Sequence, residues 1–499
     1  MAKPKAADEL QDFYDYLMKQ ETIDRSINLL ADYCAIKSVS GDETLRPECF
    51  TMVHRVYSDL HSLLGIPLVN MRIHNNPEDK KLPPILTAHM GNDPSKTTLL
   101  VYGHLDVQPA PDPENWVHQD DPFKLTKVPA TGGTFETIKY YARGSTDDKG
   151  PVLGWINAIK AYQDLNMEVP VNIKFLFECM EESGGIGLEQ LIEEQSAFFE
   201  GVDAVCISDN YWLGLTKPCV TYGLRGISYY NVTIECAAGD LHSGVYGGTV
   251  REAMIDLINI FSQLTDGKGG IKIDGVNDDV LVMTDDELAL YGPIDFDPEE
   301  YRKEIGTKEL LYPDKVGTLT HRWRYPSLSI HGFVGASDGN EDQTVIPRQV
   351  KGKFSIRLVP NQDPADIDAK VEAYVKKLHT QSGSKNPLTF VATTSAPAWV
   401  SDNTDANYKA GINAQKRVYG IEPDLTREGG SIPVTLTLQN ATNSSVMLLP
   451  IGQSDDGAHS QNEKMSERNY INGAKVLGTY LNELGKAQKT LKSKKTGKK

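Results

Sequence analysis

The chain has 499 residues, a formal net charge of −17, and a composition of 39% hydrophobic and 24% charged residues. This length is enough for about three domains, and this composition is typical of an ordinary globular protein. The negative net charge disfavours nucleic-acid binding, because phosphate contacts need a basic face. No apolar run reaches the length of a membrane span, and the first residues lack the apolar core of a signal peptide. We therefore expect a cytoplasmic protein that binds neither nucleic acid nor a membrane.

Short apolar runs of β-branched and aliphatic residues predict strands that are buried on both faces. Two helical patterns, at residues 150–165 and 185–194, separate them. Strands that alternate with helices indicate an α/β fold with a mostly parallel central sheet. Ligands of such sheets gather beyond the carboxyl ends of the strands, so the residues after these runs are candidates for one shared site. The runs cover residues 98–103, 171–178, 203–208 and 446–452.

The pattern changes near residue 220. Strand patterns at 228–236 and 352–358 there accompany helical patterns at 252–264 and 364–379. This succession predicts a smaller α+β domain inserted into the larger α/β domain.

Three parts of the chain follow from these patterns. The larger domain is discontinuous and covers residues 1–223 and 396–485, because a helical pattern resumes at 406–419. The inserted domain covers residues 224–395. Seven lysines among the last 14 residues, 486–499, predict a solvated, disordered basic tail.

Five residues of metal-binding type stand at the ends of the strand-like runs or next to a helix. Three carboxylates and two imidazoles form a mixed nitrogen and oxygen set without a soft thiolate, which suits Zn²⁺ or Mn²⁺. Each residue alone has an ordinary alternative as a surface, turn or loop residue. Together they predict a site for two divalent metal ions. They are His104, Asp147, Glu182, Asp209 and His459.

Two of these ligands have acidic neighbours. Asp106 lies two residues after His104, a spacing that lets its carboxylate orient the imidazole through the ring nitrogen that is not on a metal. Asp147 and Asp148 precede a helix, where free backbone amides favour carboxylates. Asp147 can bridge two cations or, like Asp148, cap the helix, and the residues alone leave this open.

Glu181 and Glu182 follow the strand-like run at residues 171–178. Neighbouring carboxylates near cations can divide the work, with one as ligand and the other as proton carrier. Metal coordination lowers the pKa of water towards ~7, and a second ion polarises a carbonyl. These residue types therefore favour amide hydrolysis, with Glu181 as the proton shuttle to the leaving amine; the alternative for the pair is a solvated acidic turn.

With these residues in hand, the chain closely resembles the M20 metallopeptidases, and among them the cytosolic nonspecific dipeptidases of the carnosine dipeptidase branch. The resemblance covers about residues 10 to 485. It implies a catalytic di-metal peptidase domain and an inserted lid and dimerisation domain. The motifs that carry it include GHLDVQPA (103–110), ARGSTDDKGP (142–151), MEESG (180–184), CISDNYWLG (206–214), DLHSGVYGG (240–248), LTREGGSIPVTL (425–436) and DDGAHSQNEK (455–464).

The resemblance also implies a role for each metal ligand. Asp147 would bridge the two metals. His104 and Asp209 would complete one site, while Glu182 and His459 would complete the other. Glu181 would be the general base and Asp106 would orient His104.

For the substrate, the resemblance implies a further set of residues, some in the inserted domain and some in the larger one. His242 would cross from the partner subunit of a homodimer and stabilise the tetrahedral oxyanion. Arg357 would hold the free carboxylate of the substrate, which its planar fork suits; a structural ion pair is the alternative. Further expected substrate contacts are Thr344, Gly430, Ser431 and His459.

Some departures from the family pattern concern substrate preference. Ile186 stands where close relatives have a glutamate, and Thr394 stands where they often have a histidine. A longer loop at 126–139 is expected to decorate the surface. Three hypotheses follow: a homodimeric dipeptidase acting on Xaa-Yaa dipeptides, including Cys-Gly; an N-acyl amino acid amidohydrolase with the same metal centre; and a non-catalytic scaffold.

Overall fold

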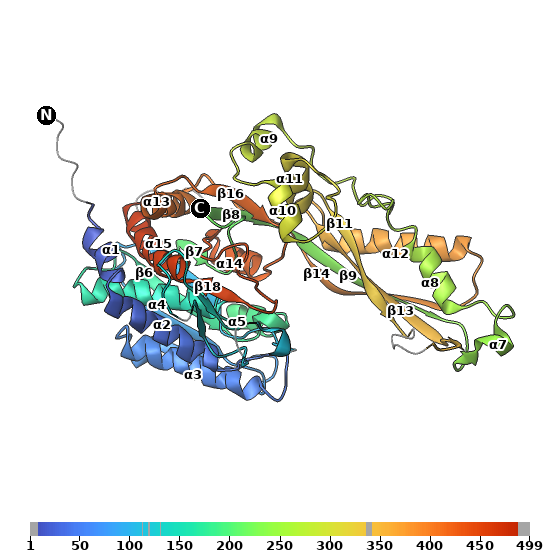
Figure 1. Ribbon diagram of the computed structural model, residues 1–499, viewed down its shortest axis with the longest axis horizontal. Helices are drawn as coiled ribbons and strands as arrows, with labels where there is room; N and C mark the ends of the chain where they lie inside the picture. The colour runs from blue at the N-terminus through green and yellow to red at the C-terminus, as the bar shows by residue number, and fades with distance from the viewer. Residues whose placement is uncertain (1–7, 112, 118–119, 130, 336–341, 488–499) are drawn as a thin grey trace. The chain divides into compact units, whose positions relative to one another are not determined.

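The protein divides into two compact units. In the computed structural model (Figure 1), the residues described are 8–111, 113–117, 120–129, 131–335 and 342–487. Unit 1 comprises Met1–Tyr222, Ser401–Thr426 and Val434–Lys499, and unit 2 comprises Gly223–Val400 and Arg427–Pro433. Residues 427–433, which the sequence pattern predicts in the larger domain, belong to unit 2 instead. Of the predicted basic tail, residues 488–499 lie outside the described residues.

A mixed sheet forms the centre of unit 1. Its strand order is β1-β2-β6-β3-β7-β17-β8, with β16 also paired to β8. The four strands β6, β3, β7 and β17 are parallel, whereas β1, β2 and β8 are antiparallel to their neighbours. The predicted parallel arrangement therefore holds for the centre of the sheet. The strands are β1 (Met71–His74), β2 (Ile85–Met90), β3 (Thr98–His104), β6 (Asn172–Glu178), β7 (Ala204–Ile207), β8 (Cys219–Leu224), β16 (Asp424–Glu428) and β17 (Ser445–Leu448).

Helices cover both faces of this sheet. Ala204 and Cys206 of β7 join the core beneath α4, α13 and α15. Val205 and Ile207 point the other way and are equally buried, on the face where α14 packs. The near-continuous apolar runs in the sequence follow from this double coverage. The helices are α1 (Gln11–Leu17), α2 (Gln20–Ala35), α3 (Arg46–Ser62), α4 (Lys149–Asp164), α5 (Leu188–Glu194), α6 (Ser196–Phe199), α13 (Ala406–Tyr419), α14 (Val434–Thr442) and α15 (Glu467–Lys486).

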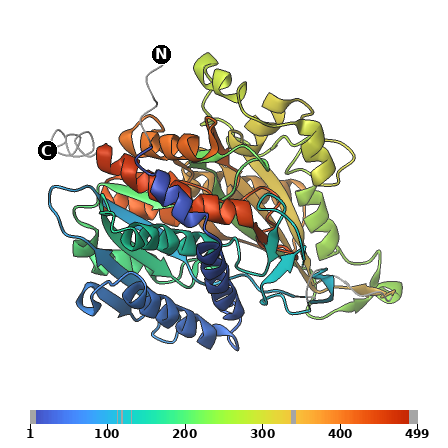
Figure 2. The same cartoon turned by 60° about the vertical axis from the view of Figure 1, so that its left-hand side comes forward.

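Segments from both ends of the chain meet in unit 1. Helix α1 packs beside α15, as the blue and red helices in Figure 2 show. Ser466 caps α15 by accepting a hydrogen bond from the amide of Asn469. Short 3₁₀ helices complete the unit: η1 (Leu68–Asn70), η2 (Pro113–Asn115) and η3 (Glu181–Ser183).

A second, three-stranded sheet of unit 1 corrects the expectation for the loop at 126–139. Both ends of that segment are strands, β4 (Thr126–Val128) and β5 (Lys139–Tyr141), which pair with each other. Strand β18 (Lys464–Ser466) pairs with β5 on its other side. Because β18 directly follows the loop that carries His459, this hairpin supports that loop and is more than a surface decoration.

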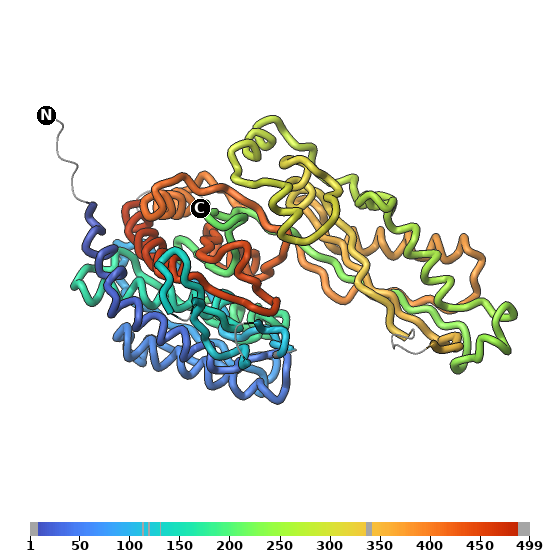
Figure 3. The backbone as a smooth tube through the Cα atoms, viewed as in Figure 1, coloured from blue at the N-terminus to red at the C-terminus, as the bar shows by residue number. Residues whose placement is uncertain are grey.

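Unit 2 is built on a four-stranded antiparallel sheet with the order β11-β13-β9-β14, whose long strands can be followed in Figure 3. Strand β9 alternates between buried and half-buried positions. Its buried side chains pack with α8 and α12 in a separate core. One face of the sheet is thus covered by helices. These elements are β9 (Gly226–Glu235), α8 (Ala253–Phe261), β11 (Ser327–Val334), β13 (Gln349–Leu358), α12 (Pro364–Gln381) and β14 (Leu388–Ala396).

Smaller elements complete unit 2. A two-stranded ladder joins β10 to β12, and β15 pairs with the end of β8. No helix in the described part of the chain combines the length and the apolarity needed to cross a bilayer. The remaining elements are β10 (Leu241–His242), α7 (Ser243–Tyr246), α9 (Asp285–Tyr291), α10 (Pro298–Glu304), α11 (Lys315–Trp323), β12 (Val345–Ile346) and β15 (Trp399–Val400).

Candidate metal centre

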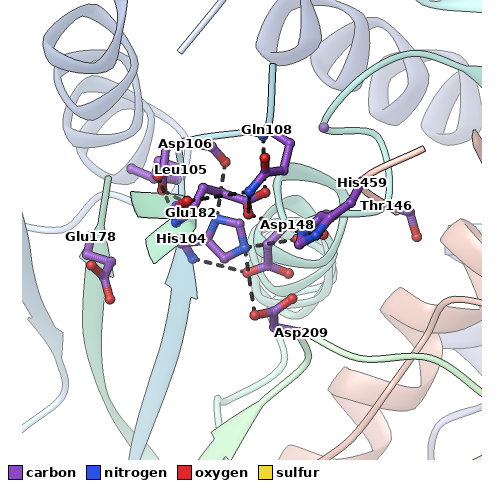
Figure 4. Close-up of polar contacts among 12 residues, drawn as sticks. His104, Leu105, Asp106, Gln108, Thr146, Asp148, Glu178, Glu182, Asp209 and His459 are labelled. Atoms are coloured by element: carbon purple, nitrogen blue, oxygen red, sulfur yellow. Dashed lines mark hydrogen bonds and ion pairs between the residues drawn. The ribbon is translucent and has the colours of Figure 1, made fainter. Parts of the chain in front are cut away.

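The five predicted ligands come together in two groups that share Asp147. In the first group, His104 Nε2 lies 3.0 Å from Asp147 Oδ1 and 3.7 Å from Asp209 Oδ2. In the second, His459 Nε2 lies 3.1 Å from Asp147 Oδ2 and 3.1 Å from Glu182 Oε2. The ligand atoms of each group lie within 4.8 Å of one another, and Figure 4 shows how the side chains converge. Each oxygen of Asp147 therefore faces a different group.

The sheet explains why distant residues meet here. His104 ends β3 and Asp209 follows β7, and these strands are parallel neighbours. Glu182 follows β6 on the other side of β3, within η3. Because the carboxyl ends of parallel strands lie at the same edge, the side chains that follow them converge. Asp147 reaches the same edge from the segment before α4.

His459 comes from an irregular loop with an unusual backbone. Its φ angle is 61°, in the left-handed region that residues other than glycine rarely adopt. Such a conformation costs about 1–3 kcal/mol and persists only where the surroundings impose it. Here the loop is closed by hydrogen bonds from the amide of Ser460 to Gly457 O and from the amide of Lys464 to Asp456 O. The loop therefore fixes the imidazole, although 58% of its side chain is exposed.

Asp106 links the first histidine to the acidic segment. Two of its oxygens face His104 Nδ1, the main-chain oxygen at 3.1 Å and Oδ1 at 3.4 Å. Its other carboxylate oxygen accepts hydrogen bonds from the Ser40 hydroxyl at 2.6 Å and from the amide of Glu182 at 3.0 Å. A fully buried carboxylate in this position fixes the tautomer and orientation of the imidazole.

The side chain of Asp148 does not cap helix α4. Asp148 stands at the N-cap of α4 but makes no capping hydrogen bond with its side chain. Its carboxylate instead accepts a hydrogen bond from the amide of His104 at 3.2 Å. Gly103 permits this contact, since a Cβ there would lie 2.8 Å from Asp148 Oδ2. Asp148 thus ties α4 to the end of β3.

Gln108, which no sequence motif singled out, holds Glu182 from two sides. Its backbone amide donates to Glu182 Oε1 at 3.1 Å, and its side-chain amide donates to Glu182 Oε2 at 2.8 Å. Two donors on one carboxylate hold that group in a single orientation. The only sequence signal was the position of Gln108 in the segment that carries His104 and Asp106.

The electrostatics of the site indicate a strongly negative environment. Hydrogen bonds to Asp147 and Glu182 raise the pKa of His459 to about 10. Burial opposes protonation of His104, but the charge of Asp209 and hydrogen bonds to nearby carboxylates outweigh it and raise the pKa well above the usual value. Burial, and then the charges of nearby acids, raises the pKa of Glu181 well above that of an ordinary glutamate. The carboxylates of the site therefore stabilise a positive charge next to them, whether on a protonated histidine or on a bound cation.

The donor set fits divalent cations. Each group offers one imidazole nitrogen and carboxylate oxygens, which are the ligand types of Zn²⁺ and Mn²⁺. Oδ1 of Asp148 is buried without a hydrogen-bond partner among the described residues. A positive charge at the centre would stabilise this buried oxygen. His104, Asp147 and Asp209 would hold one ion, and Asp147, Glu182 and His459 would hold a second.

The residues predicted to contact the substrate in unit 2 form two clusters. Arg357 lies at the centre of the first. Its Nη1 donates to the Ser431 hydroxyl at 3.0 Å, and that hydroxyl donates to Arg225 O at 2.6 Å. Burial lowers the pKa of Arg357, and no carboxylate in the described part of the chain forms an ion pair with it. The described residues thus give the alternative, a structural ion pair, no support. Gly430 adjoins Ser431, and a Cβ there would meet open space.

His242 and Thr344 form the second cluster, on the β10-β12 ladder. His242 pairs with Val345, and the amide of Ser243 donates to Thr344 O. His242 is exposed and accepts a hydrogen bond from the amide of Gly244 at 3.0 Å. Its ring therefore stands on the surface of unit 2, unlike the buried His104.

The model of peptidase family M20/M25/M40 matches residues 100–483. The chain belongs to this family. The resemblance to M20 metallopeptidases that the motifs predicted is thereby confirmed, and with it the α/β fold and the binding of divalent metal. The match includes all five clustered ligands.

Similar M20 proteins match nearly the whole chain. The Cys-Gly metallodipeptidase dug1 of Schizosaccharomyces pombe is 45% identical over 479 residues, which is 95% of this chain and 98% of the relative. The Beta-Ala-His dipeptidase of Homo sapiens is 41% identical over 468 residues, covering 92% and 90% of the two chains. The solved structure of the di-peptidase Dug1p from Saccharomyces cerevisiae has a TM-score of 0.86 and 43% identity, covering 96% of this chain and 99% of its own.

Proposed function

We propose that this M20 protein is a dipeptidase that hydrolyses the peptide bond of dipeptides with two divalent metal ions, Zn²⁺ or Mn²⁺, per subunit. One observation carries the proposal: the two oxygens of Asp147 lie 3.0 Å from His104 Nε2 and 3.1 Å from His459 Nε2. A carboxylate shared in this way can bridge two cations and reduce their mutual repulsion. The names of the similar proteins, a Cys-Gly metallodipeptidase and a Beta-Ala-His dipeptidase, support the choice of substrate.

In this proposal, bound metal activates the water and the carbonyl, and the protein side chains transfer the proton and hold the ligands in place. Bound divalent metal supplies Lewis-acid chemistry, since it makes water a stronger acid and polarises a carbonyl. Glu181 takes a proton from the attacking water and delivers it to the leaving amine. The carboxylate of Glu181 accepts the proton in the first step, and the resulting carboxyl donates it in the second. Asp106 and Gln108 hold His104 and Glu182 in place.

Unit 2 would supply the contacts to the substrate. Arg357, which has Ser431 as its hydrogen-bond partner, would bind the free carboxylate. Gly430, Ser431 and Thr344 would contact the rest of the backbone. This requirement for a terminal carboxylate limits the substrates to very short peptides.

We further propose a homodimer in which His242 reaches the metal centre of the partner subunit and donates to the oxyanion of the tetrahedral intermediate. The exposed position of His242 supports this role. A mixing experiment tests it. Neither His242→Ala nor Asp147→Asn is expected to turn over dipeptides well alone, but a mixture should recover activity, because the hybrid dimer contains one intact composite site. Lack of recovery in a mixture shown to form hybrids would contradict the shared site.

The function itself is tested with a substrate panel. Metal-stripped protein would be assayed with Mn²⁺ or Zn²⁺ added back, on Cys-Gly, β-Ala-His, Ala-Gly and the N-acetylated form of each. We expect metal-dependent cleavage of the free dipeptides alone. Preferential cleavage of the acetylated compounds would instead indicate the amidohydrolase, and no turnover with any metal would indicate a scaffold. The cytoplasmic location stays a prediction.

A further inference from the structure

A buried glutamate that neither the sequence analysis nor the proposed mechanism uses lies behind the metal centre. Glu463, four residues after His459, is fully buried. One carboxylate oxygen accepts hydrogen bonds from Arg143 Nη1 at 2.8 Å and the amide of Gly144 at 2.9 Å. The other accepts from the amides of Thr146 at 3.0 Å and Asp147 at 3.2 Å. All four partners are donors, so the geometry calls for a carboxylate that only accepts.

These contacts join three segments that carry ligands. Glu463 belongs to the loop of His459, and its four donors belong to the segment that ends at Asp147. Arg143 also donates through Nη2 to Pro109 O at 3.1 Å, beside the residue that holds Glu182. The buried carboxylate of Glu463 and its guanidinium partner Arg143 thus connect the backbones of these three segments.

From this arrangement we infer that Glu463 is a positioning residue for the metal centre: with Arg143, it sets the backbone of the Asp147 segment so that both Asp147 oxygens face the two histidines. The inference rests on the proposed function in taking these residues as ligands. Glu463 itself makes no contact with the ligand atoms and acts through the peptide groups. Oriented backbone amides around an anion are a stable way to fix a short loop.

The substitution Glu463→Gln removes the accepting charge at nearly constant volume. An amide group carries two N–H donors on one side, so it would face either Arg143 and Gly144 or Thr146 and Asp147, donor against donor. Such a mismatch moves the segment and leaves buried donors unsatisfied. Residues that orient metal ligands typically change metal affinity by about 10–100-fold when substituted.

The test measures Mn²⁺ binding to chelator-treated full-length protein by calorimetric titration, alongside thermal unfolding without metal. Glu467→Gln is the matched control. Glu467 is also buried and accepts a hydrogen bond from the Tyr140 hydroxyl at 2.6 Å, but this bond goes to β5 and not to a backbone amide of the Asp147 segment. We expect Glu463→Gln to weaken Mn²⁺ binding about 10–100-fold and Glu467→Gln to change it less than about twofold. High Mn²⁺ should restore part of the dipeptide turnover of Glu463→Gln.

Either of two results would overturn the inference: unchanged Mn²⁺ affinity in Glu463→Gln, or an equal loss in the Glu467→Gln control. If Glu463→Gln does not fold, Arg143→Lys carries the same comparison. A lysine keeps the charge but offers a single nitrogen in place of the two that bond Glu463 and Pro109 O, so weaker Mn²⁺ binding is expected and unchanged binding would refute the role. Because Mn²⁺ affinity needs no turnover, failure of the dipeptidase proposal would be seen separately.

Discussion

The two units differ in how far their sheets are covered. In unit 1 the sheet is covered on both faces and His104 is only 1% exposed, although 58% of the His459 side chain is exposed. Among the described residues of unit 2, helices cover one sheet face, strand β14 and His242 are mostly exposed, and Arg357 is half-buried. Desolvated carboxylates hold cations strongly, whereas accessible groups can meet a substrate or a second subunit. The comparison places the candidate metal ligands in unit 1, while the residues proposed for substrate recognition lie in the more open unit 2.

The largest expected effect tests the buried unit. Asp147→Asn removes the charge that both ligand groups share, and Lewis-acid stabilisation is worth several kcal/mol, so dipeptide turnover should fall by roughly 10⁴-fold or more. Metal content, measured by elemental analysis of dialysed protein, should fall in parallel. Full metal content with normal turnover would show that Asp147 does not bridge the metals.

A somewhat smaller effect should separate chemistry from metal binding within unit 1. Glu181→Gln keeps the shape of the side chain but removes the proton acceptor, so kcat should fall by about 10²–10⁴-fold. Mn²⁺ affinity should stay close to that of the unaltered protein, because Glu181 lies outside both ligand groups. Near-normal kcat in this variant would exclude Glu181 as the general base.

A substitution of the proposed substrate-binding residue in unit 2 should weaken the binding of free dipeptides. Arg357→Ala removes a charged hydrogen-bond partner worth about 1.5–3 kcal/mol, so kcat/KM for free dipeptides should fall roughly 10- to 150-fold, mainly through KM. The matched substrate is the same dipeptide with an amidated C-terminus. For this amidated dipeptide, kcat/KM should be nearly the same in Arg357→Ala and in the unaltered protein. An equal loss of kcat/KM on both substrates would argue against carboxylate recognition.

The smallest change concerns specificity. Thr394 is exposed on β14, where it pairs with Tyr229. Thr394→His restores the residue that relatives often carry, and one exposed polar contact is worth about 0.5–1.5 kcal/mol. The ratio of kcat/KM between β-Ala-His and Ala-Gly should therefore shift less than about tenfold. A collapse of turnover on both dipeptides would mean that this position supports the fold of the sheet.

Sequence reasoning recovered much of the architecture because the strongest patterns were local. The helix predicted at 406–419 has those bounds in the structure, and β3 covers the run at 98–103 with one further residue. Antiparallel edges of the central sheet and the pairing of β4 with β5 were not foreseen. Edge pairing depends on which strands become neighbours, and short strands such as β5 carry little periodicity.

The sequence by itself determined the family, the residue types of the candidate metal centre, and the strands that precede His104, Glu182 and Asp209, because strand-end residues and long motifs are local features. Only the tertiary structure decided which side chains support them. Gln108 donates hydrogen bonds to Glu182, and Asp148 accepts one from the amide of His104. Glu463 accepts hydrogen bonds from backbone amides of a segment more than 300 residues earlier. Such contacts form between segments far apart in the chain, and their geometry exists only once the sheet has aligned those segments.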